Sequence, residues 1–460
     1  MKDKKILIVG QSGVGKSTII NTLVNYFRDG SLDNIKVAIP TEHYKDVTEK
    51  DLSHDHSEEK ASKQSVSQTT ECFDYKLYSS ANGCNYIFID TPGLGDTRGR
   101  DQDNKNIEKI IDRASSHDYL DTVLFIVNGV EPRFPETVAS AFKRLASYLP
   151  DNIMKENVIL ILSKSSELSA HFPVDEFKLR VAIPKEVLYM DNTFFCKSPD
   201  DWHQNIKMER QIKNDWEDSM ETIEKILKMT SEMNYKSTED FKKIENTRDK
   251  IGSEISENMI IISTYYNLRS KLIEQKKSVN YEIEITYTET TKTPYRNIIC
   301  DGCKKTCYEK TVFVFANVIP GTDCDKCGCG YSRHHKHYYT VQKCKKNVEN
   351  VLKNITEKRR IDEKISDLDK IRDLTEETFN CIRKNSLDLK RICGKFDFIG
   401  ELSNSIEEMK KIPSEISDSD LRKNARLKID DLIEFFEQLS PPPENSNNSG
   451  GLREMPEKLL

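Results

Sequence analysis

Short runs of apolar, strand-forming residues alternate with amphipathic segments over the first two hundred residues. The runs occupy residues 4–10, 72–78, 85–90, 122–129, 157–163 and 192–198. Strands that alternate with helices in this way are typical of a mostly parallel sheet with helices on both faces. The pattern therefore predicts an α/β domain over residues 1–205.

Beyond this domain, apolar residues recur at steps of three and four, which indicates amphipathic helices over 206–280 and again over 345–440. Residues 281–344 return to strand-type alternation and carry paired cysteines. We therefore expect two helical arms that form an antiparallel, coiled-coil-like hairpin, with a small β-rich insert at its tip. The composition of residues 441–460, rich in Pro, Asn, Ser and Gly, predicts a disordered tail.

Length and charge narrow the class of protein. At 460 residues the chain exceeds the size at which one core keeps growing, so two or three structural units are expected. A formal net charge of -6, with both signs interspersed, offers no broad cationic face to a phosphate backbone, so nucleic acid is not an expected partner. No secretory signal and no run of about 18 apolar residues is present, so we expect a cytoplasmic protein without a transmembrane segment. In that compartment, clustered cysteines favour metal over disulfides.

The segment directly after the first apolar run matches the phosphate-binding loop GxxxxGK[ST] and precedes a helical run. Its glycines let successive backbone N–H groups converge on an anion, and the helix adds the positive end of its dipole. Lys16 is expected to bridge the β- and γ-phosphates, and the Ser17 hydroxyl to coordinate Mg²⁺. The loop residues predicted to bind nucleotide are Gly10, Ser12, Gly13, Val14, Gly15, Lys16, Ser17 and Thr18.

Two further segments supply groups expected around the terminal phosphate. A DTPG motif begins at Asp90, at the end of a predicted strand, where its carboxylate is expected to reach Mg²⁺ through water. The backbone N–H of Gly93 is expected to meet the γ-phosphate. Thr69, in preference to Thr70, lies before the second strand and is expected to reach over Mg²⁺ when a triphosphate is bound. The predicted magnesium ligands are thus Ser17, Thr69 and Asp90.

These segments resemble the immunity-associated nucleotide-binding GTPases, the avirulence-induced type of G domain that is related to septins. The resemblance rests on GQSGVGKST, SQTTEC, DTPGLGDTRGRDQDN and NGVEPRF, and covers about residues 4–200. The DTRGxDQDxxN continuation resembles a subgroup in which helices and a Cys/His cluster follow the G domain. The resemblance implies GTP and GDP as ligands, and G domains that pair as a homodimer in which a partner arginine reaches the phosphates. Arg133 lies where the family carries a similar Arg-aromatic box, and Arg98 is the other option.

Two positions depart from the usual GTPase pattern. Ser166 replaces the aspartate that reads guanine, and this loss lowers selectivity by orders of magnitude unless another acceptor substitutes, such as Glu167 or a backbone carbonyl. Lys164 can still lie along the base through its apolar stem. Leu94 stands where many GTPases place a water-orienting glutamine, so intrinsic hydrolysis is expected to be slow.

The insert carries a cluster of cysteines and histidines. Cys300 and Cys303, followed by Cys324 and Cys327, form two CxxC pairs at the spacing that encloses tetrahedral Zn²⁺. The cluster offers more ligands than one ion can use, which leaves a second ion open, with Cys307, Cys329, His335 and His337 as its candidate ligands and Cys344 as an additional candidate. A closed, thiolate-rich site of this kind stabilises a small domain rather than catalysing a reaction. The predicted zinc ligands are Cys300, Cys303, Cys307, Cys324, Cys327, Cys329, His335 and His337.

The sequence thus predicts a GTP-binding protein with slow, dimerisation-assisted hydrolysis, in which the nucleotide state sets the pose of a zinc-tipped helical arm. The residues expected to act in hydrolysis are Lys16, Thr69, Gly93 and Arg133. An alternative is a non-hydrolysing scaffold that nucleotide stabilises and whose helices or zinc knob bind an unknown protein partner. A third hypothesis, an ATP-binding protein, follows from the missing guanine-reading aspartate.

Overall fold

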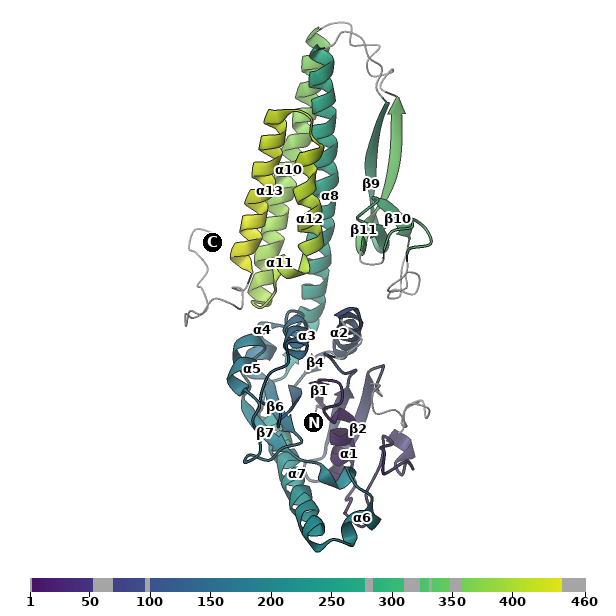
Figure 1. Ribbon diagram of the computed structural model, residues 1–460, viewed down its shortest axis with the longest axis vertical. Coiled ribbons are helices and arrows are strands. Elements are labelled where there is room, and N and C mark those ends of the chain that lie inside the picture. The colour runs from purple at the N-terminus through teal and green to yellow at the C-terminus, as the bar shows by residue number, and fades with distance from the viewer. Residues whose placement is uncertain are drawn as a thin grey trace. The chain divides into compact units, whose positions relative to one another are not determined.

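The chain forms two compact units in the computed structural model (Figure 1). The first contains Met1–Asp249 and Arg391–Gly394, and the second contains Lys250–Lys390 and Lys395–Leu460. The predicted tail at 441–460 lies outside the described residues. The structure describes residues 2–52, 69–95, 100–277, 284–309, 323–330, 333–347 and 358–440.

A six-stranded sheet lies at the centre of the first unit, with the strand order β2-β3-β1-β5-β6-β7. All neighbouring strands are parallel except β2, which is antiparallel to β3. This mostly parallel sheet confirms the predicted α/β fold class. The six strands are β1 (Lys4–Gly10), β2 (Phe73–Ser79), β3 (Cys84–Asp90), β5 (Thr122–Asn128), β6 (Val158–Ser163) and β7 (Glu186–Met190).

Helices cover both faces of this sheet because alternate residues of each buried strand point to opposite sides. In β1, Leu7 and Val9 pack in one core cluster, while Ile6 and Ile8 pack in the other. On the first side lie α2 (Arg100–Ser115), α3 (Glu136–Ala146), α4 (Asp151–Glu156) and α5 (Val174–Arg180). On the second side lie α1 (Lys16–Phe27) and α7 (Ile206–Glu232).

The helix that follows residue 205 belongs to the first unit. Ile223, Ile226 and Leu227 of α7 pack against the same sheet face as α1. After α7, the short strand β8 (Lys236–Ser237) pairs with β4 (Tyr119–Leu120). The packed region therefore extends past the boundary that the sequence predicted.

The last apolar run of the α/β domain is not a strand, and this prediction is wrong. Thr193–Phe195 forms the 3-10 helix η3, and the edge strand β7 lies just before it. Phe194 and Phe195 are adjacent and both buried in one cluster with Trp202 of α6 (Pro199–His203). An extended strand would send two adjacent side chains to opposite faces, so burial of both on one side favours the helical turn.

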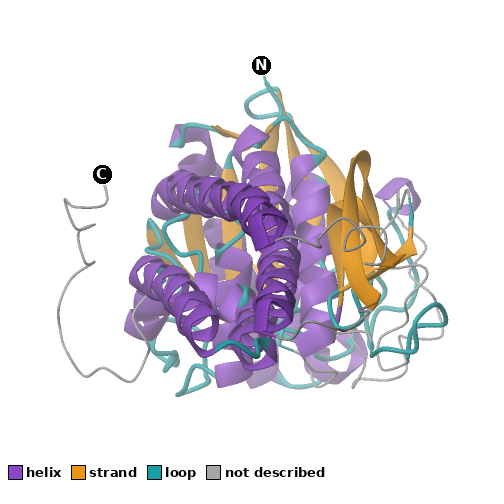
Figure 2. Cartoon of the chain, turned by 90° about the horizontal axis from the view of Figure 1, so that it is seen from above, coloured by secondary structure: helices purple, strands orange, loops and turns teal. Residues whose placement is uncertain are grey.

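Helices dominate the second unit, as the sequence predicts, and Figure 2 views them along their axes. The glutamate Oε2 of Glu254 on α8 accepts a hydrogen bond from Asn385 of α10 at 2.8 Å. An ion pair joins Arg383 of α10 to Asp431 of α13, so the helices form a bundle larger than a two-helix hairpin. None of the described helices is both long and apolar enough to cross a membrane. The helices are α8 (Glu239–Lys277), α10 (Lys358–Ile392), α11 (Phe398–Glu401), α12 (Ser403–Lys411) and α13 (Ser419–Leu439).

The β-rich insert lies in the chain between α8 and α10. It is an antiparallel sheet with the order β10-β9-β11, made of β9 (Glu284–Cys300), β10 (Lys305–Tyr308) and β11 (His334–Asn347). Ile299, Tyr339 and Val341 of this sheet pack in one apolar cluster with Ile260 of α8. The sheet therefore packs against the long helix α8.

Candidate functional site

The loop between β1 and α1 is curled by two glycines. Gly13 and Gly15 have φ angles of 77° and 93°, in the left-handed region that favours glycine. Gly15 precedes α1 directly, and no side chain caps that end of the helix in the structure. The first-turn N–H groups of α1 therefore point toward the loop opening, which is the arrangement that binds an anion.

Lys16 lies beneath this loop and is 7% exposed. Its Nζ donates to the carbonyl oxygens of Gly10, at 3.3 Å, and Gln11, at 3.1 Å. Burial lowers the pKa of Lys16 to about 8, although the nearby carboxylate of Asp90 raises it. A desolvated ammonium held by carbonyls of its own loop gains from an incoming phosphate.

Asp90 ends β3 and is completely buried. Its Oδ1 accepts from the backbone N–H of Thr91 at 3.0 Å, and its Oδ2 accepts from the Thr69 hydroxyl at 3.5 Å. Burial raises the pKa of Asp90 to about 6, and Lys16 counteracts this rise. The structure thus brings together Thr69 and Asp90 as the sequence predicts, with Ser17 in the first turn of α1. Their hydroxyl and carboxylate oxygens are the hard ligands that suit Mg²⁺.

The phosphate loop and the DTPG loop are hydrogen-bonded to each other. The backbone N–H of Leu94 donates to Gly10 at 3.1 Å, and the N–H of Ser12 donates to the Leu94 carbonyl at 3.0 Å. A Cβ at Gly93 would lie 2.7 Å from the Cα of Ser12, so this close approach requires glycine. The Leu94 side chain is 0% exposed and packs in the core.

Helix α2 braces the DTPG loop through two buried side chains that the sequence analysis did not assign to the site. Asp103 accepts a hydrogen bond from the backbone N–H of Gly95 at 2.8 Å. Asn106 donates to the carbonyl of Gly93 at 2.8 Å. Their spacing of three residues on one helix face, shortly after DTPG, was the available signal. Arg144 of α3 donates to the other oxygen of Asp103 at 3.4 Å.

Lys164 follows β6 and reaches back to the phosphate loop. Its Nζ donates to the carbonyl of Gly13 at 2.8 Å, and its own backbone has a φ of 57°. Ser166 is exposed, and its N–H is bonded to the hydroxyl of Ser169 at 2.9 Å. Glu167, the acceptor suggested from the sequence, is exposed as well.

A second carboxylate lies beside Lys164. Asp191 directly follows β7 and is half-buried. Burial raises the pKa of Asp191, Asp215 raises it further, and Lys164 acts to lower it. Sequence reasoning missed this residue because only the pairing of β6 with β7 brings it to Lys164.

Arg133 lies on the surface, next to the buried Phe134. Within the part of the chain that the structure describes, Arg133 forms no ion pair. The alternative, Arg98, lies outside the described residues.

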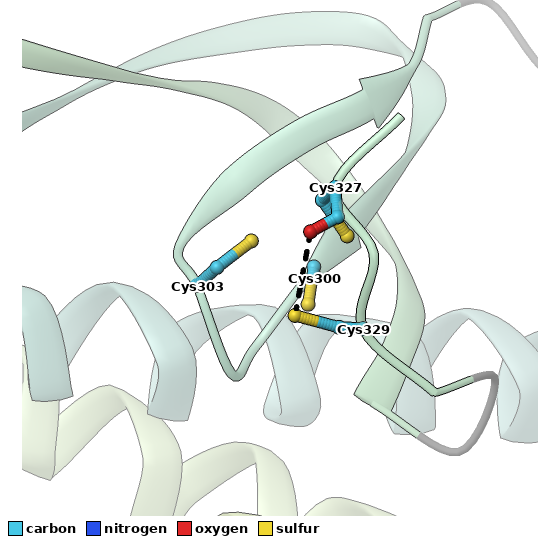
Figure 3. Close-up of side chains that lie close together, drawn as sticks. All are labelled: Cys300, Cys303, Cys327 and Cys329. Carbon is cyan, nitrogen blue, oxygen red and sulfur yellow. Dashed lines mark hydrogen bonds between the residues drawn. The ribbon is translucent and has the colours of Figure 1, made fainter. Parts of the chain in front are cut away.

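Six cysteines and one histidine gather in the β-rich insert. Cys300 ends β9, Cys307 lies on β10 and His334 begins β11. Their ligand atoms form two sets of four, and within each set all four atoms lie within 4.8 Å of one another. Thiolates and imidazole in groups of four are the donors of structural zinc sites. The first set is Cys300, Cys303, Cys327 and Cys329 (Figure 3), and the second is Cys307, Cys324, Cys327 and His334.

The structure separates two of the predicted zinc ligands from this cluster. The Nε2 atoms of His335 and His337 lie 3.6 and 3.5 Å from the carboxylate of Asp301. His334 takes their place beside the cysteines. In a strand, His335 and His337 share one face and His334 points to the other. The two histidines beside Asp301 therefore lie on the opposite face of β11 from the histidine beside the cysteines.

The comparisons with known proteins agree with the geometry of the first unit. The family described as 50S ribosome-binding GTPase matches residues 5–164. These residues form a P-loop GTPase domain. This GTPase domain implies guanine nucleotide and Mg²⁺ as ligands. No curated protein sequence matches the chain.

Several solved structures are similar to parts of this chain at low identity and low TM-score. Era from Aquifex aeolicus, bound to GDP.AlF4-, is 17% identical over 45% of this chain and 57% of its own, with a TM-score of 0.27. Toc33 from Arabidopsis thaliana is 16% identical over 48% of this chain and 85% of its own, with a TM-score of 0.25. The septin GTPase domain from Chlamydomonas reinhardtii is 16% identical over 36% of this chain and 56% of its own, with a TM-score of 0.22. None of these likenesses distinguishes the immunity-associated type from other GTPases.

Proposed function

We propose that the chain is a GTP-binding protein that hydrolyses GTP slowly and whose GTPase domain pairs with a second copy in a nucleotide-dependent manner. The observation that carries the proposal is the convergence of Lys16, Thr69 and Asp90 beneath the phosphate loop. Lys16 would hold the β- and γ-phosphates, while Ser17, Thr69 and Asp90 would hold Mg²⁺. The ion would neutralise phosphate charge and keep the terminal phosphate in place.

The burial of Leu94 supports slow hydrolysis. Its side chain packs in the core, and its backbone N–H and carbonyl are both bonded to the phosphate loop. No amide or carboxylate stands at this position to orient the attacking water. Intrinsic turnover should therefore be no faster than that of unassisted GTPases that carry the glutamine, on the order of 10⁻⁴ s⁻¹.

The exposed position of Arg133 supports a role in a partner's site, as the family resemblance implies. A guanidinium that neutralises charge on the γ-phosphate raises the rate by about 10³ or more. We expect the turnover per molecule to rise with protein concentration, and Arg133→Ala to abolish that rise. Arg210→Ala, which removes another exposed arginine of the same unit, is the matched control. A rate that does not depend on concentration would overturn the pairing part of the proposal.

We further propose that Asp191 reads guanine in place of the missing aspartate. Guanine offers an N1–H and an exocyclic amine, and one carboxylate accepts from both, whereas adenine offers no such pair. Asp191→Asn should weaken GTP binding at least about 100-fold, because the amide presents a donor to the guanine amine. The same variant should gain affinity for xanthosine triphosphate, which carries a carbonyl in place of that amine.

Glu167→Gln is the control for this experiment, because Glu167 is exposed. It should leave the preference between guanine and xanthine unchanged. If Glu167→Gln shifts the preference and Asp191→Asn does not, Asp191 does not read the base. If the wild-type chain binds ATP more tightly than GTP, the guanine assignment itself fails.

A non-hydrolysing scaffold is the second candidate, and the buried Leu94 favours it as well. In that case, bound nucleotide stabilises the GTPase domain, and the helices or the cysteine-rich insert bind a protein partner. Single-turnover measurements with excess protein separate the two. GDP that forms from GTP at a measurable rate supports the GTPase, whereas GTP that stays intact over many hours supports the scaffold.

A further inference from the structure

We propose that the β-rich insert holds two zinc ions that share the thiolate of Cys327, with His334 as a ligand of the second ion. The proposal does not depend on the nucleotide chemistry of the first unit. It differs from the single-ion site that the two CxxC pairs alone predict, in which Cys300, Cys303, Cys324 and Cys327 would enclose one ion.

The grouping of ligand atoms favours two ions. Each of the two sets contains four atoms that lie within 4.8 Å of one another, and Cys327 belongs to both sets. A tetrahedral zinc ion takes four ligands, so seven side chains satisfy two ions when one thiolate is shared. In this grouping Cys300 and Cys303 fall in one set, and Cys324 falls in the other.

Cys327 has close neighbours on both sides. Its Sγ lies within 4.8 Å of the Sγ atoms of Cys303 and Cys329 in the first set and of Cys307 in the second. Its Sγ lies 3.2 Å from the Nε2 of His334. With Zn–S near 2.3 Å and Zn–N near 2.0 Å, tetrahedral ligands of this kind lie about 3.5 Å apart. The spacing thus suits a metal ion between the two side chains.

His334 is oriented as a metal ligand. It is buried, and its Nδ1 lies 3.1 Å from the carbonyl oxygen of Gly330. A carbonyl only accepts, so Nδ1 carries the proton and the lone pair of a neutral ring is left on Nε2, which faces Cys327. Second-shell bonds of this type fix the tautomer of zinc-bound histidines.

The backbone holds the thiols in place through two turns of the same kind. The N–H of Lys304 donates to Cys300 at 2.8 Å, and the N–H of Gly328 donates to Cys324 at 2.7 Å. Lys304 and Gly328, which follow the second cysteine of each pair, have φ angles of 51° and 70°. Each CxxC pair is therefore carried on the same kind of hydrogen-bonded turn.

A cationic side chain lies near the cluster. A centre with two zinc ions and six thiolates has more thiolate charge than metal charge, so it is anionic. Arg333 lies close enough to Cys329 to influence its charge.

The first test is the zinc content of the intact chain, measured by native mass spectrometry after expression with zinc. We expect two ions per chain, and Cys381→Ser, which removes an exposed cysteine away from the cluster, should also retain two. One ion in the wild-type chain would overturn the proposal.

Variants then assign the ligands. His334→Ala should lose one ion, whereas His335→Ala, its neighbour in β11, should keep both. Cys307→Ser and Cys329→Ser should each lose one ion, although the single-ion site predicts no loss from either. Cys327→Ser should make both ions at least about 100-fold easier to remove with a competing chelator. Retention of one ion at wild-type affinity in Cys327→Ser would exclude a shared thiolate.

Cobalt substitution of the wild-type chain tests whether the Cys327 thiolate bridges the two ions, and it needs no variant. Two Co²⁺ ions joined by one thiolate couple magnetically, so the electron paramagnetic resonance signal per cobalt should fall as the second equivalent binds. Signals that add in proportion through the second equivalent would show two separate ions and overturn the bridging role of Cys327.

Discussion

Asp90→Asn should stabilise the nucleotide-free GTPase domain while it removes magnesium-dependent nucleotide binding. Asp90 is completely buried, and burial raises its pKa from 3.8 to about 6, so ionising it at neutral pH costs roughly 3 kcal/mol in the folded state. Asparagine has the same shape and still accepts from the N–H of Thr91. The attraction to Lys16 is already part of this pKa, because it lowers the value that burial raises. The net gain should therefore approach roughly 3 kcal/mol.

Urea denaturation followed by tryptophan fluorescence measures this gain. Both tryptophans, Trp202 and Trp216, lie in one cluster of the first unit, so their emission reports the unfolding of that unit. The protein is stripped of nucleotide and magnesium before the measurement. Adding Mg²⁺ and a guanine nucleotide should then raise the midpoint of the wild type and leave Asp90→Asn unchanged.

The pH dependence has a definite sign. Between pH 3.8 and about 6 the folded state holds a proton on Asp90 that the unfolded state has lost. Stability of the wild type therefore falls as the pH rises through this window, and the advantage of Asp90→Asn should vanish below it. Asp74→Asn should act in the opposite direction. Burial raises the pKa of Asp74, but hydrogen bonds from His117 and Arg113 outweigh this and lower it. An Asp90→Asn variant less stable than the wild type at pH 7 would refute the reasoning.

Three further changes have definite outcomes. Gly93→Ala should lower guanine-nucleotide affinity at least about tenfold in an equilibrium titration, because its Cβ would lie 2.7 Å from the Cα of Ser12; unchanged affinity would contradict this. Asp103→Ala should destabilise the first unit by about 1.5–3 kcal/mol in the urea assay, because its carboxylate accepts from the N–H of Gly95. Asp101→Ala, exposed on the same helix, should have no effect, and equal losses would argue against the brace. Removing metal with a chelator should make six further thiols per chain reactive, and an unchanged thiol count would mean that these cysteines bind none.

The sequence predicts those parts of the fold in which neighbours along the chain decide the structure. The phosphate loop, its preceding strand and its following helix are contiguous, so one motif specifies all three. The stretch with Phe194 and Phe195 could not be assigned this way, because the same apolar residues suit a strand or a helical turn. Only the contact with Trp202 decides between them.

The candidate site is less predictable where partners come from distant segments. Asp191 comes to lie beside Lys164 only through the alignment of β7 beside β6. Among the histidines, the sequence cannot say which face of β11 each one occupies until the start of that strand is known. The pairing of His334 with Cys300 sets that register and leaves His335 and His337 to Asp301.

The place of Leu94 limits how this GTPase domain can evolve. Because the side chain is part of the core and its backbone is bonded to the phosphate loop, glutamine at this position would bury an amide among apolar neighbours. Burying an unpaired amide costs about 1–3 kcal/mol, a large share of the stability of an ordinary domain. One substitution therefore cannot give this domain a water-orienting glutamine without a loss of stability. A related GTPase domain that hydrolyses GTP faster would have to acquire its catalytic group from another structural element of the chain or from another molecule.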